Sequence, residues 1–470
     1  MPGSEAKRMW RVILDGDGTH TEEGMKGAAF VFTQAASAMV LLAVGRAASG
    51  ALVQPPFAIY TGTGDQSIPD VAFDPINNRA LVTWVENAPT GGALAVRGQL
   101  MNADGTAYGP AISISAAGSR DAWYGLGMGT SRVVAFDPDD QRYLVVWVDA
   151  RSPSGGAKIY GQLLNPDGSL YGDNFAISPG GSVGAPTVAF DSINDRFLVS
   201  WTGTRPSPPT NVYAQLVDSN GSLYGSTVAV TERVDSYHAT RPKIAFDPGN
   251  EQFLVTWAQQ YDGYLYGRMI DRDGLLFGSE ITVGYYGLGS SNDVGAIAFD
   301  PVNDRFLRIW DSTKGQFINP DGTLYGGEFS CFEPGEYDID YSDLTVDSAN
   351  GRFLITAGVE DPYLGVIGRY LNLDGSTDGS AFPILDVWSY PPERETHIGS
   401  YLPSVAFGSA GTGSFVVWAD MLTRDGTGYD IFGTFVKYGD VPPEVPAPAA
   451  LLTGTVGLGF LSWLRRRRML

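Results

Sequence analysis

The sequence predicts an all-β fold made of seven copies of one repeat, and three observations support this. The template, residues 133–178, returns in variant copies that begin at residues 71, 188, 244, 297, 344 and 405. Each copy opens with a phrase such as VAFDPINNRALVTW, rich in the β-branched and aromatic residues that favour strands. Asp-Pro and Asp-Gly pairs, which favour tight turns, separate these runs. Sheet repeats of roughly 40–60 residues with such punctuation are typical of β-propellers.

Each repeat contains four predicted strands. In the template they cover residues 133–137, 143–148, 159–164 and 175–178. The first two runs are apolar with almost no alternation, which is typical of strands buried on both faces. The third run alternates more and leads through NPDGSLYG, a turn of the Asp-Gly type, into the fourth. A four-stranded repeat corresponds to one propeller blade.

The turn between the first two strands suggests an ion pair. In the template the segment FDPDDQR places Asp137 and Arg142 on either side of an Asp-Pro turn, where they can pair. The same two residue types recur in four other repeats, as Asp74 with Arg79, Asp191 with Arg196, Asp300 with Arg305 and Asp347 with Arg352.

The two ends of the repeat array complement each other. The last repeat has predicted strands at residues 404–407, 415–418 and 431–437, and then continues into VPPEVPAP without a fourth. Residues 56–74 match residues 174–191, so a spare fourth strand precedes the first repeat. We expect this strand to complete the last blade and close the ring, which removes sheet edges open to aggregation. A single seven-bladed propeller over residues 52–440 is favoured over an open array or two smaller domains.

Composition excludes some function classes. The formal net charge of −21 disfavours nucleic-acid binding, because basic patches supply most of that affinity. A solvated acidic surface is the simplest interpretation of this charge. Cys331 is the single cysteine, so the chain forms no internal disulfide.

The N-terminal region predicts export. Residues 25–51 combine a short positive start, an apolar stretch and small residues suited to signal peptidase, as in a signal peptide. Residues 1–24 are polar, and we interpret them as a wrongly assigned start or a leader extension. Both interpretations give the same exported product. A retained N-terminal membrane anchor is the alternative.

The C-terminal residues 441–470 predict a membrane-directed tail. A Pro motif, VPAPA at residues 445–449, precedes an apolar segment at residues 450–464, which is short against the roughly 20 residues that span a bilayer. Four arginines follow and would fix the orientation of the segment, with the arginines in the cytoplasm. A plain C-terminal membrane anchor is one interpretation of this order. The residues that carry the signal are Val445, Pro446, Pro448, Arg465, Arg466, Arg467 and Arg468.

This tail resembles the C-terminal sorting signal of the PEP-CTERM class, and VPAPA looks like its VPxPA variants. Ala447 stands where the best-known form has Glu. The resemblance implies processing by an exosortase, a transient inner-membrane stage, removal of the tail near residues 446–449, and delivery to the cell surface or extracellular matrix alongside exopolysaccharide. The repeats resemble those of bacterial secreted propellers with the phrases AFDP, LVVW, YGQ and DGS.YG, a resemblance that implies no activity.

The loops at one end of the blades are the candidate binding site. The turns within strand pairs one-two and three-four are nearly uniform, as folding requires, whereas the loops between strands two and three and between blades vary. Variable loops on a rigid scaffold usually carry binding sites. We therefore expect a non-catalytic glycan- or matrix-binding protein that uses aromatic and polar residues there: Trp123, Tyr124, Tyr237, Arg241, Tyr261, Trp388 and Arg394.

Two other site types are weaker. His238 and His397 enter the fourth and seventh blades and could serve as acid and base on an acidic polysaccharide, although no nucleophile motif or close carboxylate pair accompanies them. Calcium is a possible cofactor because Asp271, Asp273 and the NxDG turns offer oxygen ligands, but the same residues build tight turns. A polysaccharide hydrolase or lyase and a purely structural matrix protein are the alternative functions.

Overall fold

The computed structural model describes only part of the chain. It describes residues 51–62, 64–87, 94–115, 132–151, 156–204, 210–231, 238–260, 262–287, 295–311, 313–333, 338–361, 365–386, 402–409, 412–420 and 429–439. These residues form β-strands and no helix. Within these ranges, no helix has the length and apolar character needed to cross a membrane. The predicted signal peptide, sorting tail and C-terminal helix lie outside the described residues.

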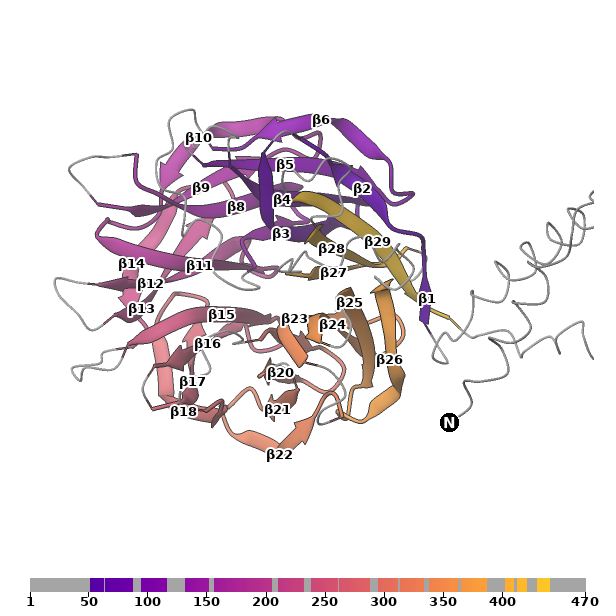
Figure 1. Ribbon diagram of the computed structural model, residues 1–470. Helices are drawn as coiled ribbons and strands as arrows, with labels where there is room; N and C mark the ends of the chain where they lie inside the picture. The colour runs from indigo at the N-terminus through magenta and orange to yellow at the C-terminus, as the bar shows by residue number, and fades with distance from the viewer. Residues whose placement is uncertain are drawn as a thin grey trace, which may run out of the picture. The chain divides into compact units, whose positions relative to one another are not determined.

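The strands form seven antiparallel sheets, and the protein is a seven-bladed β-propeller with four-stranded blades (Figure 1). The first blade consists of β3 (Asp65–Asp74), β4 (Arg79–Asn87), β5 (Ala95–Asn102) and β6 (Ala107–Ser113). The second consists of β7 (Val134–Asp137), β8 (Arg142–Asp149), β9 (Lys158–Leu164) and β10 (Leu170–Ala176). The third consists of β11 (Ser182–Asp191), β12 (Arg196–Thr204), β13 (Asn211–Asp218) and β14 (Leu223–Ala229).

The next three blades repeat this order. The fourth blade consists of β15 (Ala239–Asp247), β16 (Gln252–Gln259), β17 (Tyr264–Asp271) and β18 (Leu276–Tyr285). The fifth consists of β19 (Ile297–Asp300), β20 (Arg305–Trp310), β21 (Lys314–Ile318) and β22 (Leu324–Ser330). The sixth consists of β23 (Asp338–Asp347), β24 (Arg352–Asp361), β25 (Gly365–Asn372) and β26 (Thr377–Asp386).

The seventh sheet combines the two ends of the array. Its sequential strands are β27 (Ser404–Ser409), β28 (Gly413–Asp420) and β29 (Asp430–Tyr438). The N-terminal strands β1 (Ala51–Val53) and β2 (Phe57–Tyr60) both pair antiparallel with β29, β2 through Phe57 opposite Gly433. The spare strand predicted from the sequence therefore lies against the last strand of the array.

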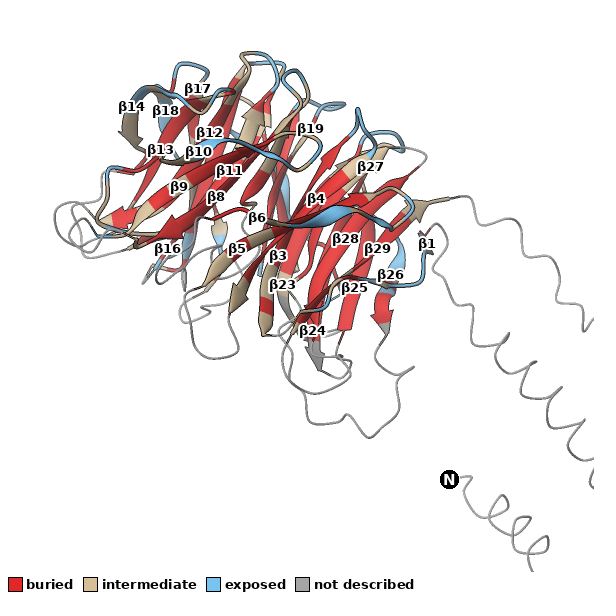
Figure 2. Cartoon of the chain, turned by 90° about the horizontal axis from the view of Figure 1, so that it is seen from above, coloured by how far each residue is buried: buried red, intermediate tan, exposed pale blue. Residues whose placement is uncertain are grey.

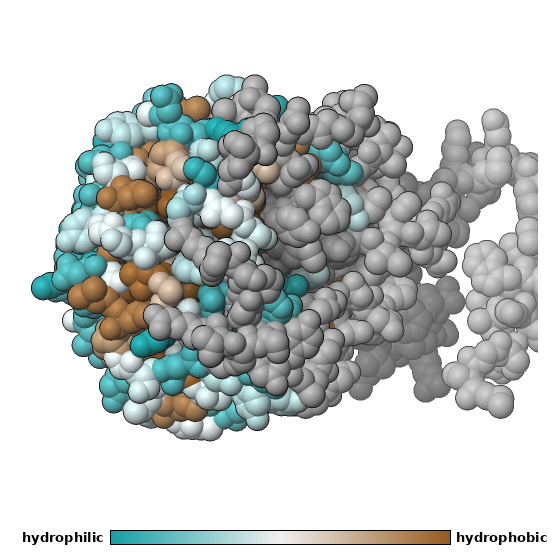
Figure 3. Space-filling model, turned by 90° about the vertical axis from the view of Figure 1, so that its left-hand side faces the viewer, coloured by the Kyte–Doolittle hydropathy of each residue, from teal (hydrophilic) through white to brown (hydrophobic). Residues whose placement is uncertain are grey.

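The inner strands are buried and the outer strands are not, as the absence of alternation predicts (Figure 2). All eight residues of β16 are buried, whereas β10 and β22 are mostly exposed. Six tryptophans from the second strands are essentially inaccessible, and several stack on an aromatic ring of the third strand, as Trp147 does on Tyr160 at 6.4 Å. On the side shown in Figure 3, hydrophobic side chains form patches separated by hydrophilic ones.

The fourth strands begin earlier than the sequence predicts. In the template the strand starts at Leu170, not at residue 175, because the LYG segment of the turn motif already pairs with β9. A bulge between Tyr171 and Phe175 then shifts the register. The turn residues and the strand are thus one continuous edge.

The prediction of Asp–Arg ion pairs is wrong, because none of the five pairs forms among the described residues. Asp191 Oδ1 instead accepts the turn N–H groups of Ile193 and Asn194, both at 2.9 Å. Arg196 places its guanidinium 3.5 Å from the ring centroid of Tyr224 and donates to Asp218 at 3.1 Å. Arg79 with Tyr108 and Arg142 with Tyr171 repeat this cation–π contact. The aspartate caps its own turn, and the arginine holds the outer strand to the blade.

Candidate functional site

The first strand of each blade lines a central channel of 440 Å³. Most of the residues that line it are apolar, such as Val71, Ala72 and Phe73 of β3, and Arg132 and Thr345 line it as well. A cluster of polar side chains lies at the position directly before the repeated Val-Ala-Phe-Asp phrase, which falls inside strands β3 and β23.

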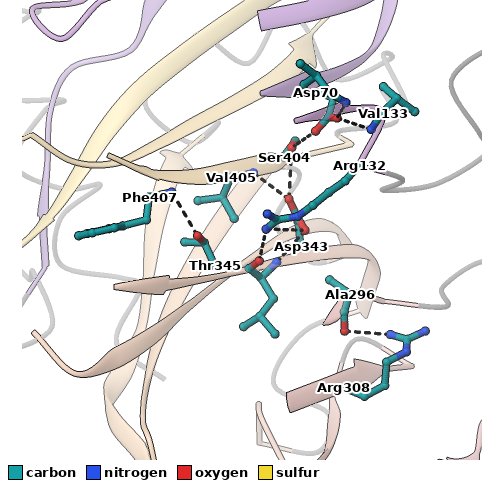
Figure 4. Close-up of polar contacts among 12 residues, drawn as sticks. Asp70, Arg132, Val133, Ala296, Arg308, Asp343, Thr345, Ser404, Val405 and Phe407 are labelled. Atoms are coloured by element: carbon teal, nitrogen blue, oxygen red, sulfur yellow. Dashed lines mark hydrogen bonds and ion pairs between the residues drawn. The ribbon is translucent and has the colours of Figure 1, made fainter. Parts of the chain in front are cut away.

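Asp70 is the centre of this polar cluster (Figure 4). It is 3% exposed, and its Oδ2 accepts the backbone N–H groups of Val133 at 2.6 Å and Val134 at 3.0 Å in the second blade. Its Oδ1 accepts the hydroxyl of Ser404 in the seventh blade at 2.7 Å. One carboxylate thus joins the first blade to both of its neighbours.

Asp343 makes the corresponding contacts from the sixth blade. Its Oδ2 accepts the N–H of Val405 at 2.9 Å and lies 3.2 Å from the Ser404 hydroxyl oxygen, whose single proton points to the nearer Asp70, and its Oδ1 accepts the N–H of Leu344 at 2.8 Å. Arg132 of the second blade reaches across the channel mouth, donates to the carbonyl of Leu344 and lies 3.9 Å from Asp343 Oδ1. The cluster uses its carboxylates to connect four blades, so we assign it a structural role.

Sequence reasoning missed this cluster, although a signal was present. The residue directly before the repeated strand phrase varies while the phrase stays constant: Asp70, Val133, Thr187, Lys243, Ala296, Asp343 and Ser404 occupy it. Because the repeats are arranged in a ring, equivalent positions of neighbouring blades lie close together. One variable position in otherwise similar repeats therefore places different side chains next to each other.

His238, a predicted catalytic residue, is held by hydrogen bonds between two blades. Its Nδ1 accepts the backbone N–H of Thr210 at 3.0 Å, so the neutral ring carries its proton on Nε2. The backbone carbonyl of His238 accepts the N–H of Gln260 at 2.9 Å. The Thr210 contact connects the third blade to the fourth, whereas the Gln260 contact lies within the fourth blade. The second predicted catalytic residue, His397, lies outside the described residues.

The predicted binding residues are only partly described. Arg241 has a φ of 53° and donates its backbone N–H to Thr202 Oγ1 at 3.2 Å, at the register shift that precedes Lys243. The aromatic and charged residues named with it fall outside the described ranges, as do the seven residues of the sorting signal: Trp123, Tyr124, Tyr237, Tyr261, Trp388 and Arg394; Val445, Pro446, Pro448, Arg465, Arg466, Arg467 and Arg468.

An exposed aromatic pair lies on this same end of the fourth blade. Tyr264 begins β17 and Tyr285 ends β18, and the two residues are opposite each other in the register. The two residues are 40% and 43% exposed, and their ring centroids lie 4.9 Å apart with the ring planes at 59°. Asp262 supports the pair by accepting the N–H of Tyr264 at 2.9 Å and the hydroxyl of Tyr266 at 3.1 Å. We call these four residues the tyrosine patch.

The sequence pointed to this region without identifying the pair. Tyr261, one of the predicted binding residues, lies close in sequence to Asp262 and Tyr264. Tyr286, which follows Tyr285, is buried and donates its hydroxyl to the carbonyl of Gln259 at 2.9 Å. Burial raises the pKa of the Tyr286 hydroxyl. Tyr264 was not predicted, because it stands inside a strand pattern.

The predicted calcium turn is a tight turn in the structure. Asp271 Oδ1 accepts the N–H groups of Asp273 at 3.0 Å and Leu275 at 2.8 Å. These hydrogen bonds close the turn between β17 and β18.

No family model and no curated protein sequence matches the chain. Among solved structures, an α-L-arabinanase of Penicillium chrysogenum complexed with arabinobiose is 12% identical with a TM-score of 0.48, over 71% of this chain and 99% of that one. The Dos1 propeller is 10% identical with a TM-score of 0.48, over 83% and 97%. Raptor of Chaetomium thermophilum is 9% identical with a TM-score of 0.49, over 83% and 30%. Similarities at this level carry no conclusion about activity.

Asp70 makes the stability of the propeller depend on pH. Burial raises the pKa of Asp70 from 3.8 to about 6, against the lowering effect of the Ser404 hydroxyl. The folded protein therefore holds this proton more tightly than the unfolded chain, so the Asp70 contribution to stability falls as pH rises from about 4 to 6. We expect wild type to lose about 2 kcal/mol relative to Asp70→Asn between pH 4 and pH 7. Urea unfolding at each pH measures this, and a pH-independent difference would contradict it.

Proposed function

We propose that this protein is an exported propeller that binds a glycan or matrix component through the variable-loop end of its blades, without catalysis. The tyrosine patch is the observation that carries the proposal. Tyrosine combines a large apolar ring with a polar hydroxyl, which makes it frequent in binding surfaces. Here strand pairing places Tyr264 opposite Tyr285 and their rings contact each other, which limits the side-chain ordering that binding requires.

The chemistry of the patch suits a sugar. The C–H groups on one face of a pyranose ring form an apolar surface that stacks on an aromatic ring, and the sugar hydroxyls need polar partners at the edge. The Tyr264 and Tyr285 rings supply two surfaces at 59° to each other. Lys314 lies beside them and donates to the Tyr285 carbonyl at 3.4 Å, and its Nζ is ion-paired with Asp311 at 3.5 Å and Glu328 at 3.9 Å.

Export and sorting belong to the same proposal. We propose removal of residues 25–51 by signal peptidase and of the tail by an exosortase, with delivery to the cell surface or matrix. The signal-peptide pattern and the VPAPA motif with its arginine cluster support this. Intact mass spectrometry of the secreted protein tests it. A chain that starts near residue 52 and ends near residues 446–449 is expected, whereas a chain that retains residues 450–470 contradicts removal of the tail.

We also propose that β2 closes the ring as the fourth strand of the seventh blade. Ile59 is buried, and the ring of Phe57 lies 5.9 Å from that of Phe415 and 6.0 Å from that of Phe435. The pairing of β2 with β29 supplies the hydrogen bonds that an edge strand would otherwise lack.

The tyrosine patch gives a direct test of binding. We expect Tyr264→Ala with Tyr285→Ala to weaken binding to exopolysaccharide from the producing strain at least tenfold, because each stacked ring contributes apolar contact. Tyr325→Ala is the matched control, since Tyr325 is 53% exposed but lies in β22 beside the uniform turn. Affinity electrophoresis measures binding, and a reducing-sugar assay in the same samples measures cleavage. Equal loss in both variants, or release of reducing ends, would contradict the proposal.

A further inference from the structure

The turn after the first strand contains a repeated hydrogen bond. In five blades the asparagine three residues after the capping aspartate donates its side-chain amide to the free carboxylate oxygen, Oδ2. The donor–acceptor distances are 2.8 Å for Asn77 to Asp74, 3.0 Å for Asn194 to Asp191, 2.9 Å for Asn250 to Asp247, 2.8 Å for Asn303 to Asp300 and 2.8 Å for Asn350 to Asp347.

The same amide often reaches the next blade as well. It donates to an oxygen of the residue that follows the equivalent asparagine position there. The distances are 3.3 Å for Asn77 to Gln141, 3.4 Å for Asn194 to Glu251 and 3.4 Å for Asn250 to Asp304. At these three joints, a neutral donor lies between two side-chain oxygens of neighbouring blades.

The joint between the second and third blades lacks this amide. Asp140 occupies the asparagine position, and its Oδ2 forms an ion pair with Arg142 Nη1 at 3.0 Å. Asp137, which is 0% exposed, still caps its turn through Oδ1, but its Oδ2 is buried without a hydrogen-bond partner. In the third blade Asp195 accepts the Ser219 hydroxyl through Oδ2 at 2.9 Å, and its Oδ1 is likewise buried without a partner.

Two buried carboxylate oxygens thus lie together where the other joints hold a donor. An unpaired buried anion is costly, so a proton or a cation must compensate it.

We propose that Asp137, Asp139 and Asp195 bind a calcium ion that connects the second and third blades. One carboxylate oxygen from each lies within 4.8 Å of the others. Oxygens bound to one calcium ion at 2.3–2.6 Å can be about 5 Å apart, whereas magnesium at 2.0–2.1 Å requires a tighter set. Asp139 is exposed, so water has access to complete the coordination. The ion takes the place of the amide that bridges neighbouring blades at three other joints.

The test compares calcium binding and thermal unfolding of the full chain and three variants. Isothermal titration calorimetry with CaCl2 measures binding, and melting in CaCl2 against EDTA measures its effect. We expect calcium to raise the melting temperature of the wild type by several degrees. Asp195→Asn should weaken calcium binding at least tenfold. Asp140→Asn, which restores the amide of the other blades, should melt higher in EDTA and lose most of the calcium shift.

Asp304→Asn is the matched control. Asp304 is equivalent to Asp195, and it lies at the joint between the fourth and fifth blades, where Asn250 still donates its amide. It should keep the wild-type calcium shift. The proposal is overturned if the wild type binds no calcium at millimolar concentration, or if Asp195→Asn or Asp140→Asn keeps the full shift. An equal shift with MgCl2 overturns the assignment to calcium. If only a fall in pH below 6 stabilises the wild type, a shared proton takes the place of the ion.

Discussion

The contact between neighbouring blades is the constraint on which the rest of this structure depends. Each blade buries both faces of its inner strands, so it needs a blade on either side to cover them. In the seventh sheet a strand from the N-terminal side of the chain pairs with the last strand of the array, since β2 pairs with β29. Polar side chains then fix the blades relative to one another, with Asp70 and Asp343 at one end and the capped turns at the other.

The two ends of the propeller show how sequence uniformity relates to role. The turn end repeats one set of contacts, an aspartate cap and an arginine on a tyrosine ring, as with Arg196 and Tyr224. The loop end carries dissimilar residues on the same frame, including the tyrosine patch. Because the cluster around Asp70 occupies its carboxylates in contacts between blades, the exposed rings of Tyr264 and Tyr285 are better suited to an external ligand.

The architecture was predictable from sequence because it depends on local pattern. Repeated apolar runs and Asp-Gly turns predicted the four strands of each blade, and the match of residues 56–74 to 174–191 predicted where β2 pairs. The Asp–Arg pairs failed because sequence proximity does not show which groups the backbone presents to the carboxylate. The Asp191 carboxylate accepts a hydrogen bond from the backbone of its own turn, and the Arg196 guanidinium packs on the ring of Tyr224 two strands away.

The polar sites were less predictable because their members meet only after the ring forms. Asp70 and Ser404 lie 334 positions apart in the chain and bond at 2.7 Å. Asp137 and Asp195 look like ordinary turn residues until the neighbouring joints are compared. Tyr264 was hidden in a strand pattern, and only the exposure of that strand end reveals it.

The stability contributed by β2 tests the account of a closed, rigid ring most directly. Ile59 is buried in the seventh blade, whereas its neighbour Ala58 is exposed. We expect Ile59→Ala to lower the free energy of unfolding by about 2–5 kcal/mol in urea titrations, as for other buried aliphatic truncations. Ala58→Ser should change it by less than about 0.5 kcal/mol. If the two variants unfold with the same free energy, β2 does not complete the last blade and the ring is not closed in this way.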